Sequence, residues 1–159
     1  MLTSGTLSRY LRDFAVSGLT SNPTIFDQAI EIAGVYEEAI REKAAAGKSG
    51  EALFFELALE DLTRAADVFR SIHDATDAMD GWVSLEVSPL LADDLAGTVK
   101  AAIDLRARAR RRNFFIKIPG TRAGATAIEE AIFGVCRSTS PCCSAASTMS
   151  QRPKRTCAV

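Results

Sequence analysis

Lys117 is the residue in this sequence whose surroundings most clearly suggest chemistry. It is the one charged residue in the run from Phe114 to Pro119 (FFIKIP). Burial among apolar side chains disfavours an ammonium ion and would lower the pKa of the lysine. A neutral lysine amine attacks carbonyl groups and forms a Schiff base. The pattern alone also allows a lysine at a sheet edge that extends its amine to water.

Two further polar residues lie in or just after β-like runs. Glu86 shares one face of the alternating segment 82–87 with Ser84. Directed into a barrel, its carboxylate could transfer protons, but the strand pattern alone favours an ordinary solvated face. Asn22 follows the apolar run 14–20. It could present its amide to a ligand at the carboxyl end of a strand, although a cap for the next helix is the favoured interpretation.

Other candidate groups give weaker signals. His73 is the only histidine and stands near a predicted helix end, which is typical of a surface or capping residue. Arginines cluster in 106–112, where a solvated helix end is favoured over a phosphate site. The segment 120–124 lacks the Gly-Lys-Ser/Thr ending of a phosphate loop. Residues 1–135 contain no cysteine, so we expect neither a metal site nor a cysteine protease there.

The elements that must position these groups alternate along the chain. β-like runs and helical periodicities give the order β-α-α-β-α-β-α, which is typical of a parallel α/β sheet or barrel. The runs cover 14–20, 82–87 and 114–118, and the helices about 23–46, 49–73, 91–112 and 124–133. A closed eight-stranded barrel needs roughly 200 residues or more. With about three of eight strands visible, we expect a partial (β/α)8 TIM barrel.

The composition is that of an ordinary globular chain. Its 159 residues are 47% hydrophobic and 25% charged, which argues against disorder, collagen and coiled coil. The net charge of -1 gives no basic excess for nucleic acid. No apolar run approaches the roughly 20 residues that cross a bilayer, and residues 1–11 lack the apolar core of a signal peptide. We therefore expect a cytoplasmic protein with no nucleic-acid or membrane partner.

The last 24 residues have a different composition from the rest. All four cysteines lie after residue 135. Segment 136–159 has four basic residues and no acidic one, against 15 basic and 20 acidic residues in 1–135. The cysteine spacing lacks the paired C-x2-C arrangement of common zinc sites, and no histidine accompanies it. A zinc or disulfide module is therefore disfavoured.

Three segments, taken together, resemble the transaldolase family. They are Val16–Phe26, Gly81–Asp94 and Asn113–Thr121, the last followed by Gly124 and Ala127–Ala131. The resemblance covers about 1–135. It implies a (β/α)8 barrel enzyme of the pentose phosphate pathway that uses no metal or organic cofactor. Such an enzyme moves a dihydroxyacetone unit from sedoheptulose 7-phosphate to glyceraldehyde 3-phosphate, giving erythrose 4-phosphate and fructose 6-phosphate.

The resemblance also implies roles for three residues. Lys117 matches the Schiff-base lysine, Glu86 the glutamate that shuttles protons through a water molecule, and Asn22 the asparagine that binds the dihydroxyacetone unit. The family's first strand carries a further catalytic aspartate, and segment 1–7 resembles the stretch directly after that strand. We therefore expect a chain shortened at its N-terminus, with impaired turnover.

The change of composition at residue 136 fits a shift of reading frame. A back-translation of 136–159 with suitable synonymous codons, read two bases later, gives PIDVTLLFSREHYVAAAEAYLRG. This text resembles the family's next strand and helix. We predict that 1–135 is a partial transaldolase barrel and that 136–159 is an out-of-frame, disordered tail. A non-catalytic α/β fragment and another Schiff-base aldolase, such as one for deoxyribose phosphate, remain alternatives.

Overall fold

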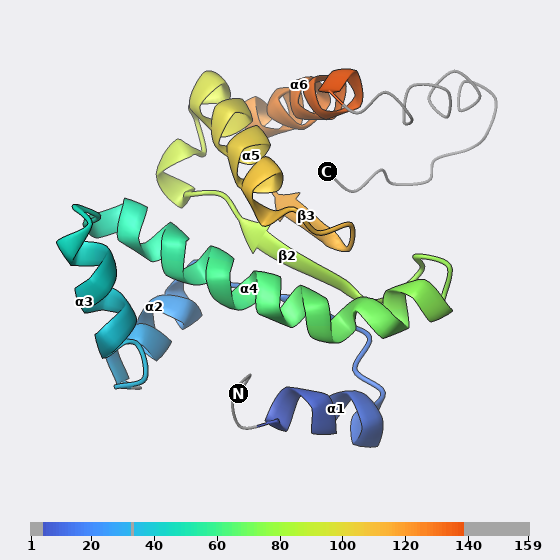
Figure 1. The fold of residues 1–159 in the computed structure, drawn as a ribbon. Coiled ribbons are helices and arrows are strands. Elements are labelled where there is room, and N and C mark those ends of the chain that lie inside the picture. The colour runs from blue at the N-terminus through green and yellow to red at the C-terminus, as the bar shows by residue number, and fades with distance from the viewer. Residues whose placement is uncertain (1–4, 33, 139–159) are drawn as a thin grey trace. The chain divides into compact units, whose positions relative to one another are not determined.

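A computed structural model describes residues 5–32 and 34–138 of the chain (Figure 1). The helices are α1 (Thr6–Phe14), α2 (Pro23–Ile32), α3 (Glu37–Ala45), α4 (Gly50–Ala75), the short 3-10 helix η1 (Pro89–Leu91), α5 (Leu95–Ala109) and α6 (Arg122–Ser138). The strands are β1 (Gly18–Thr20), β2 (Trp82–Glu86) and β3 (Phe114–Lys117). The chain divides into two compact units. One comprises the segments up to Glu86 and Arg108–Phe115, and the other Val87–Ala107 and the segment from Ile116 onward.

The strands form one parallel sheet in the order β1-β2-β3. β1 and β2 pair in parallel. Between β2 and β3, Val83 N donates to Asn113 O and Val87 N donates to Lys117 O, each at 3.0 Å. The offset between donor and acceptor is the same at both positions, so this pair is parallel as well. The predicted α/β fold class with a parallel sheet, as in part of a (β/α)8 barrel, is confirmed.

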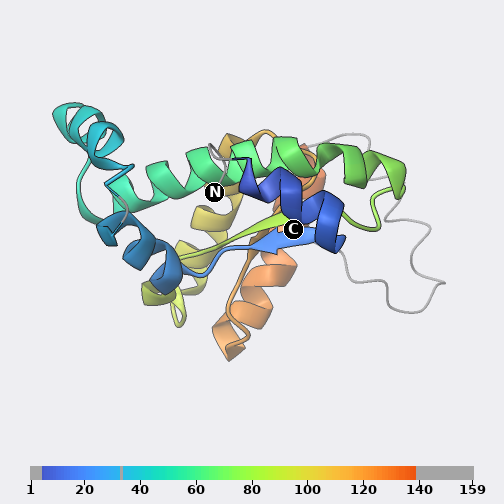
Figure 2. The same cartoon turned by 90° about the horizontal axis from the view of Figure 1, so that it is seen from below.

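In the first unit, α4 runs along β2, and β1 lies beside β2 (Figures 1 and 2). The apolar residues that recur every three or four positions along α4 are buried at Leu59, Leu62, Ala66 and Phe69. This spacing keeps their side chains on one face of the helix, as an apolar stripe. Val83 and Leu85 of β2 are 0% and 1% exposed. The stripe and the strand therefore form the core of this unit.

The helix predicted over 23–46 is wrong as a single element, because it is two helices. The chain breaks between α2 and α3, where Gly34 has a φ of +51°. Glycine adopts this left-handed conformation at little cost, and an α-helix cannot continue through it. Tyr36 donates a side-chain hydrogen bond to Asp61. This bond ties the break to α4.

The first β-like run is shorter than predicted. Only Gly18–Thr20 is a strand, because Phe14 still belongs to α1, which has no counterpart among the predicted elements. Ala15 follows α1 with a φ of +50° and ends it. The apolar residues at 14–16 therefore lie at the end of α1 and in the connection to β1, not in a strand.

In the second unit, α5 begins later than predicted. The side chain of Asp94 accepts a hydrogen bond from Gly97 N at 2.9 Å, so this carboxylate caps α5, which begins at Leu95 and not at residue 91. At the other end Arg110 has a φ of +48°, and 110–112 therefore lie beyond the helix. A Cβ atom at Gly134 would lie 2.9 Å from Ile103 Cδ1, so α6 packs closely on α5 at this glycine.

The predicted tail begins inside an element that the structure describes. Residues 136–138 are the last three residues of α6. Segment 139–159, the rest of the predicted tail, lies outside the described residues. Among the helices of the described segments, none combines the length and apolar composition needed to cross a membrane.

Candidate active site

The carboxyl ends of β1 and β2 bring two predicted site residues to the same end of the sheet. Thr20 and Ser84 lie opposite each other in the parallel pairing. Ser84 Oγ donates a hydrogen bond of 2.9 Å to Thr20 Oγ1, so both side chains project from one face. Asn22 and Glu86 each stand two residues further along their chains. Alternation along β2 directs Glu86, which is half-buried, to the face of Ser84.

Asn22 is the N-cap of α2. Its Oδ1 accepts hydrogen bonds from Thr24 N at 3.0 Å and from Ile25 N at 3.3 Å. The favoured prediction of a cap is therefore confirmed. Both bonds use the oxygen of the amide, so the cap fixes the orientation of the side chain without using its Nδ2 donors. The residue is exposed.

Lys117 is the last residue of β3 and belongs to the second unit, unlike Asn22 and Glu86. Phe114 and Ile116 are 1% and 4% exposed, whereas Lys117 is exposed. Of the two positions that the sequence left open for the amine, buried and exposed, the structure shows the exposed one. The run alternates between a buried and an open face, although its composition suggested burial on both faces.

The face that carries Ser84 continues toward the start of β2 with aromatic side chains. The rings of Trp82 and Phe115 lie 6.0 Å apart between centroids in an edge-on arrangement. Trp82 also donates from Nε1 to Ala78 O at 3.0 Å. Trp82 was not among the predicted site residues, although its spacing of two from Ser84 along β2 was a signal for a common face.

His73 is buried, so its prediction as a surface residue is wrong. It is 6% exposed, because α4 continues beyond it and Trp82 packs against it with ring centroids 4.9 Å apart. Its Nδ1 lies 3.5 Å from the carboxylate of Asp74, at the limit of a hydrogen bond. Within the described segments, no group of three or more His, Cys, Asp or Glu side chains is arranged to hold a metal ion.

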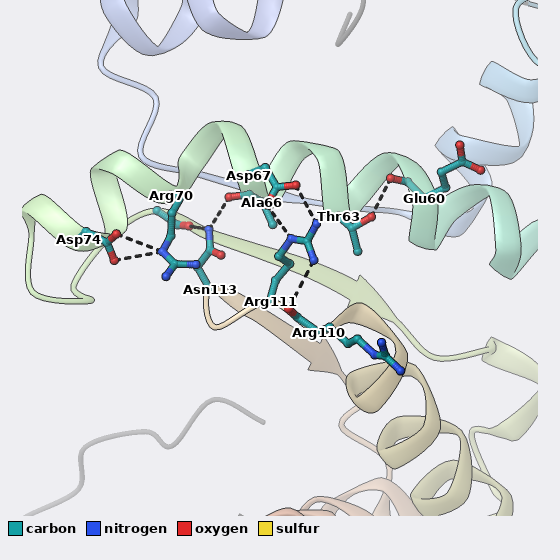
Figure 3. A network of polar contacts seen from close by, with 10 residues as sticks. Glu60, Thr63, Ala66, Asp67, Arg70, Asp74, Arg110, Arg111 and Asn113 are labelled. Atoms are coloured by element: carbon teal, nitrogen blue, oxygen red, sulfur yellow. Dashed lines mark hydrogen bonds and ion pairs between the residues drawn. The ribbon is translucent and has the colours of Figure 1, made fainter.

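The arginines of 106–112 include two with carboxylate partners. Arg111 donates to both oxygens of Asp67, at 2.6 and 2.9 Å, as Figure 3 shows. This hydrogen-bonded pair lowers the pKa of the Asp67 carboxyl. Arg108 lies 2.9 Å from Glu56. Both guanidinium groups thus join the segment at the end of α5 to α4, which supports the structural interpretation of this cluster over a phosphate site.

Comparison with known proteins identifies the family. The transaldolase/fructose-6-phosphate aldolase family matches residues 2–133. A transaldolase of Saccharopolyspora erythraea is 46% identical over 127 residues, which cover 80% of this chain and 34% of that protein. A transaldolase of an Arthrobacter species is 42% identical over 127 residues, with the same shares of 80% and 34%. Transaldolase 1 of Streptomyces coelicolor is 41% identical over 131 residues, 82% of this chain and 34% of that protein.

The chain therefore belongs to the transaldolase/fructose-6-phosphate aldolase family. It spans about a third of the length of these relatives, 34% of each. The matched region contains all three predicted site residues, Asn22, Glu86 and Lys117.

Proposed function

We propose that this chain carries transaldolase chemistry, the transfer of a dihydroxyacetone unit between sugar phosphates. The donor is a ketose phosphate such as sedoheptulose 7-phosphate, and the acceptor is glyceraldehyde 3-phosphate. The observation that carries the proposal is the position of Lys117, at the end of a parallel strand within the segment that matches the family. Carbonyl chemistry needs a primary amine, and side chains at the carboxyl ends of barrel strands form the active sites of this architecture.

The proposed reaction begins with attack of the neutral Lys117 amine on the ketone of the donor. Loss of water gives an iminium ion at C2 of the ketose, which withdraws electrons from the C3–C4 bond. Loss of the proton of the C4 hydroxyl then breaks this bond, releases C4 as an aldehyde and leaves an enamine on the lysine. The enamine adds to the acceptor aldehyde, and water releases the new ketose phosphate and restores the amine.

In this scheme Glu86 transfers protons, and Asn22 orients the dihydroxyacetone unit. The Glu86 carboxylate takes the hydroxyl proton through a water molecule and returns it in the second half of the reaction. Asn22 donates from its amide nitrogen to an oxygen of the dihydroxyacetone unit. The N-cap bonds support this role, because they hold the oxygen of the amide and leave its donors for the ligand. We propose the cytoplasm as the compartment of this reaction, which is a step of the pentose phosphate pathway.

Borohydride trapping tests the proposal. The full chain is incubated with fructose 6-phosphate and sodium borohydride, and the modified peptide is identified by mass spectrometry. We expect a reduced adduct on Lys117, which Lys117→Ala abolishes. Lys100→Ala, which removes another exposed lysine, serves as the matched control and should leave the adduct unchanged. Absence of an adduct in chain that is folded by circular dichroism, or an adduct that persists in Lys117→Ala, would contradict the proposal.

A second activity is a simple aldolase, because the family description includes fructose-6-phosphate aldolase. The two reactions differ in the fate of the enamine, which a transaldolase passes to an aldehyde acceptor and an aldolase protonates. The named relatives are transaldolases, which favours transfer. Release of free dihydroxyacetone from fructose 6-phosphate without any acceptor would identify the aldolase.

A further inference from the structure

Ser84 holds the end of β1 through two separate hydrogen bonds. Its Oγ donates to Thr20 Oγ1 at 2.9 Å, and its carbonyl oxygen accepts from Ser21 N at 3.1 Å. Ser84 is 2% exposed, whereas Thr20 is exposed, so the serine side of the pair is shielded from water and the threonine side is not. One residue of β2 therefore fixes both the backbone and a side chain where β1 ends.

A hydroxyl pair is not the arrangement that burial alone would favour here. The neighbours of Ser84 on β2, Val83 and Leu85, are apolar and almost completely buried. A valine at position 84 would remove more apolar surface from water than the serine does. The hydroxyls instead form a directional bond that holds only one relative position of the two strands. An apolar pair would tolerate small shifts between the strands.

The position of the pair connects it to both proposed site residues of this unit. Asn22 and Glu86 each follow the pair by two residues, one on either strand. A displacement of about 1 Å between reacting groups can lower a rate by about a hundredfold. We propose that Ser84 and Thr20 are positioning residues that hold Asn22 and Glu86 in register for the reaction, an inference that rests on the proposed function.

Variants that delete one hydroxyl at a time test this proposal in the full chain. Ser84→Ala and Thr20→Val remove the same hydrogen bond, and Thr20→Ser retains a hydroxyl. Thr63→Val is the matched control, because Thr63 Oγ1 also donates a hydrogen bond of 2.9 Å, to the backbone of Glu60 within α4. The readouts are the limiting rate and half-saturating concentration of borohydride trapping with fructose 6-phosphate, and amide hydrogen exchange by NMR.

We expect Ser84→Ala and Thr20→Val each to lower the limiting rate about tenfold. The limiting rate of the double variant should be no lower than that of either single variant, because all three lack the same hydrogen bond between Ser84 and Thr20. Thr20→Ser should restore the wild-type rate, and Thr63→Val should keep it. The amides of Ser21 and Thr24 should exchange faster in the two disruptive variants, with no change at the amide of Ala66 in α4.

The outcomes separate this proposal from the proposed function. Wild-type trapping rates in Ser84→Ala and Thr20→Val would overturn the positioning role while leaving the lysine chemistry intact. A wild-type chain that forms no adduct would overturn the proposed function. In that case amide exchange decides the positioning role: faster exchange at Ser21 and Thr24 supports it, and unchanged exchange overturns it.

Discussion

The side-chain amide of Asn113 donates a hydrogen bond of 2.8 Å to the carbonyl oxygen of Ala66 (Figure 3). The same nitrogen donates to Gly81 O at 2.9 Å, and the residue is 0% exposed. One buried side chain thus joins α4, the residue that precedes β2 and the residue that precedes β3. Its removal should therefore weaken the first unit as a whole.

We expect Asn113→Ala to lower the free energy of unfolding by about 2 kcal/mol, because it removes both hydrogen bonds that the buried amide donates. Asn113→Asp should cost more, since a carboxylate would face two carbonyl oxygens and supply no donor. Urea unfolding at pH 7, followed by circular dichroism, measures both changes. Equal stability of Asn113→Asp and the wild-type chain would contradict the role of the amide donors.

Gly81 meets two requirements that only glycine satisfies together. Its φ is +78°, and a Cβ atom at this position would lie 2.4 Å from His73 N. Gly47 provides a matched control, because its φ is +81° and no atom lies within 4 Å of the same position. We expect Gly47→Ala to cost about 1 kcal/mol for the left-handed backbone alone. Gly81→Ala should cost at least about 2 kcal/mol more, because the backbone of α4 must shift. If urea unfolding gives the same loss of stability for Gly81→Ala and Gly47→Ala, the close approach to His73 does not contribute to the loss.

The sequence predicted the elements whose signal is local. The stripe of α4 and the alternation of β2 were visible because each repeats within one segment, and burial confirms them at Phe69 and Val83. The break at Gly34 was missed, because the apolar spacing continues across it on both sides. A single glycine there outweighs the periodicity.

The candidate site was predictable only in part, because only some of its features leave a signal within one segment of the sequence. Residue type and strand-end position selected Asn22, Glu86 and Lys117. The bond between Thr20 and Ser84 joins residues 64 positions apart, and no local pattern shows which residues of two strands will lie opposite each other. The pattern around Lys117 left both a buried and an exposed amine open, because the composition of its run resembles that of a strand buried on both faces, and the structure shows the exposed one.

The ion pair of Asp67 and Arg111 predicts a dependence of stability on pH. The bond from Arg111 holds the pKa of Asp67 below its value in the unfolded chain. The pair therefore stabilises the fold fully above the unfolded pKa, and this contribution is lost as the pH falls through the folded pKa. Because solvent screens the pair, we expect a contribution of at most about 1 kcal/mol.

Asp67→Asn should accordingly reduce stability at pH 6 and have little effect near pH 2, as measured by urea unfolding across this range. Arg111→Lys is the second variant, since a lysine cannot donate to both carboxylate oxygens in the same plane. It should lose part of the same contribution. A difference between Asp67→Asn and wild type that stays constant from pH 6 to pH 2 would show that the pair is not its origin.

Asn22 allows its two proposed roles to be separated by substitution. Asn22→Asp keeps an oxygen that accepts from Thr24 N and Ile25 N, and its negative charge is favourable at a helix N-terminus. We expect it to stay within about 0.5 kcal/mol of wild-type stability, whereas Asn22→Ala should lose about 1 kcal/mol. Neither variant can donate a hydrogen bond to the ligand, so both should trap fructose 6-phosphate about a hundredfold more slowly. If Asn22→Asp traps the sugar phosphate at the wild-type rate, the residue is a cap alone, because the amide nitrogen is the one group that this substitution removes.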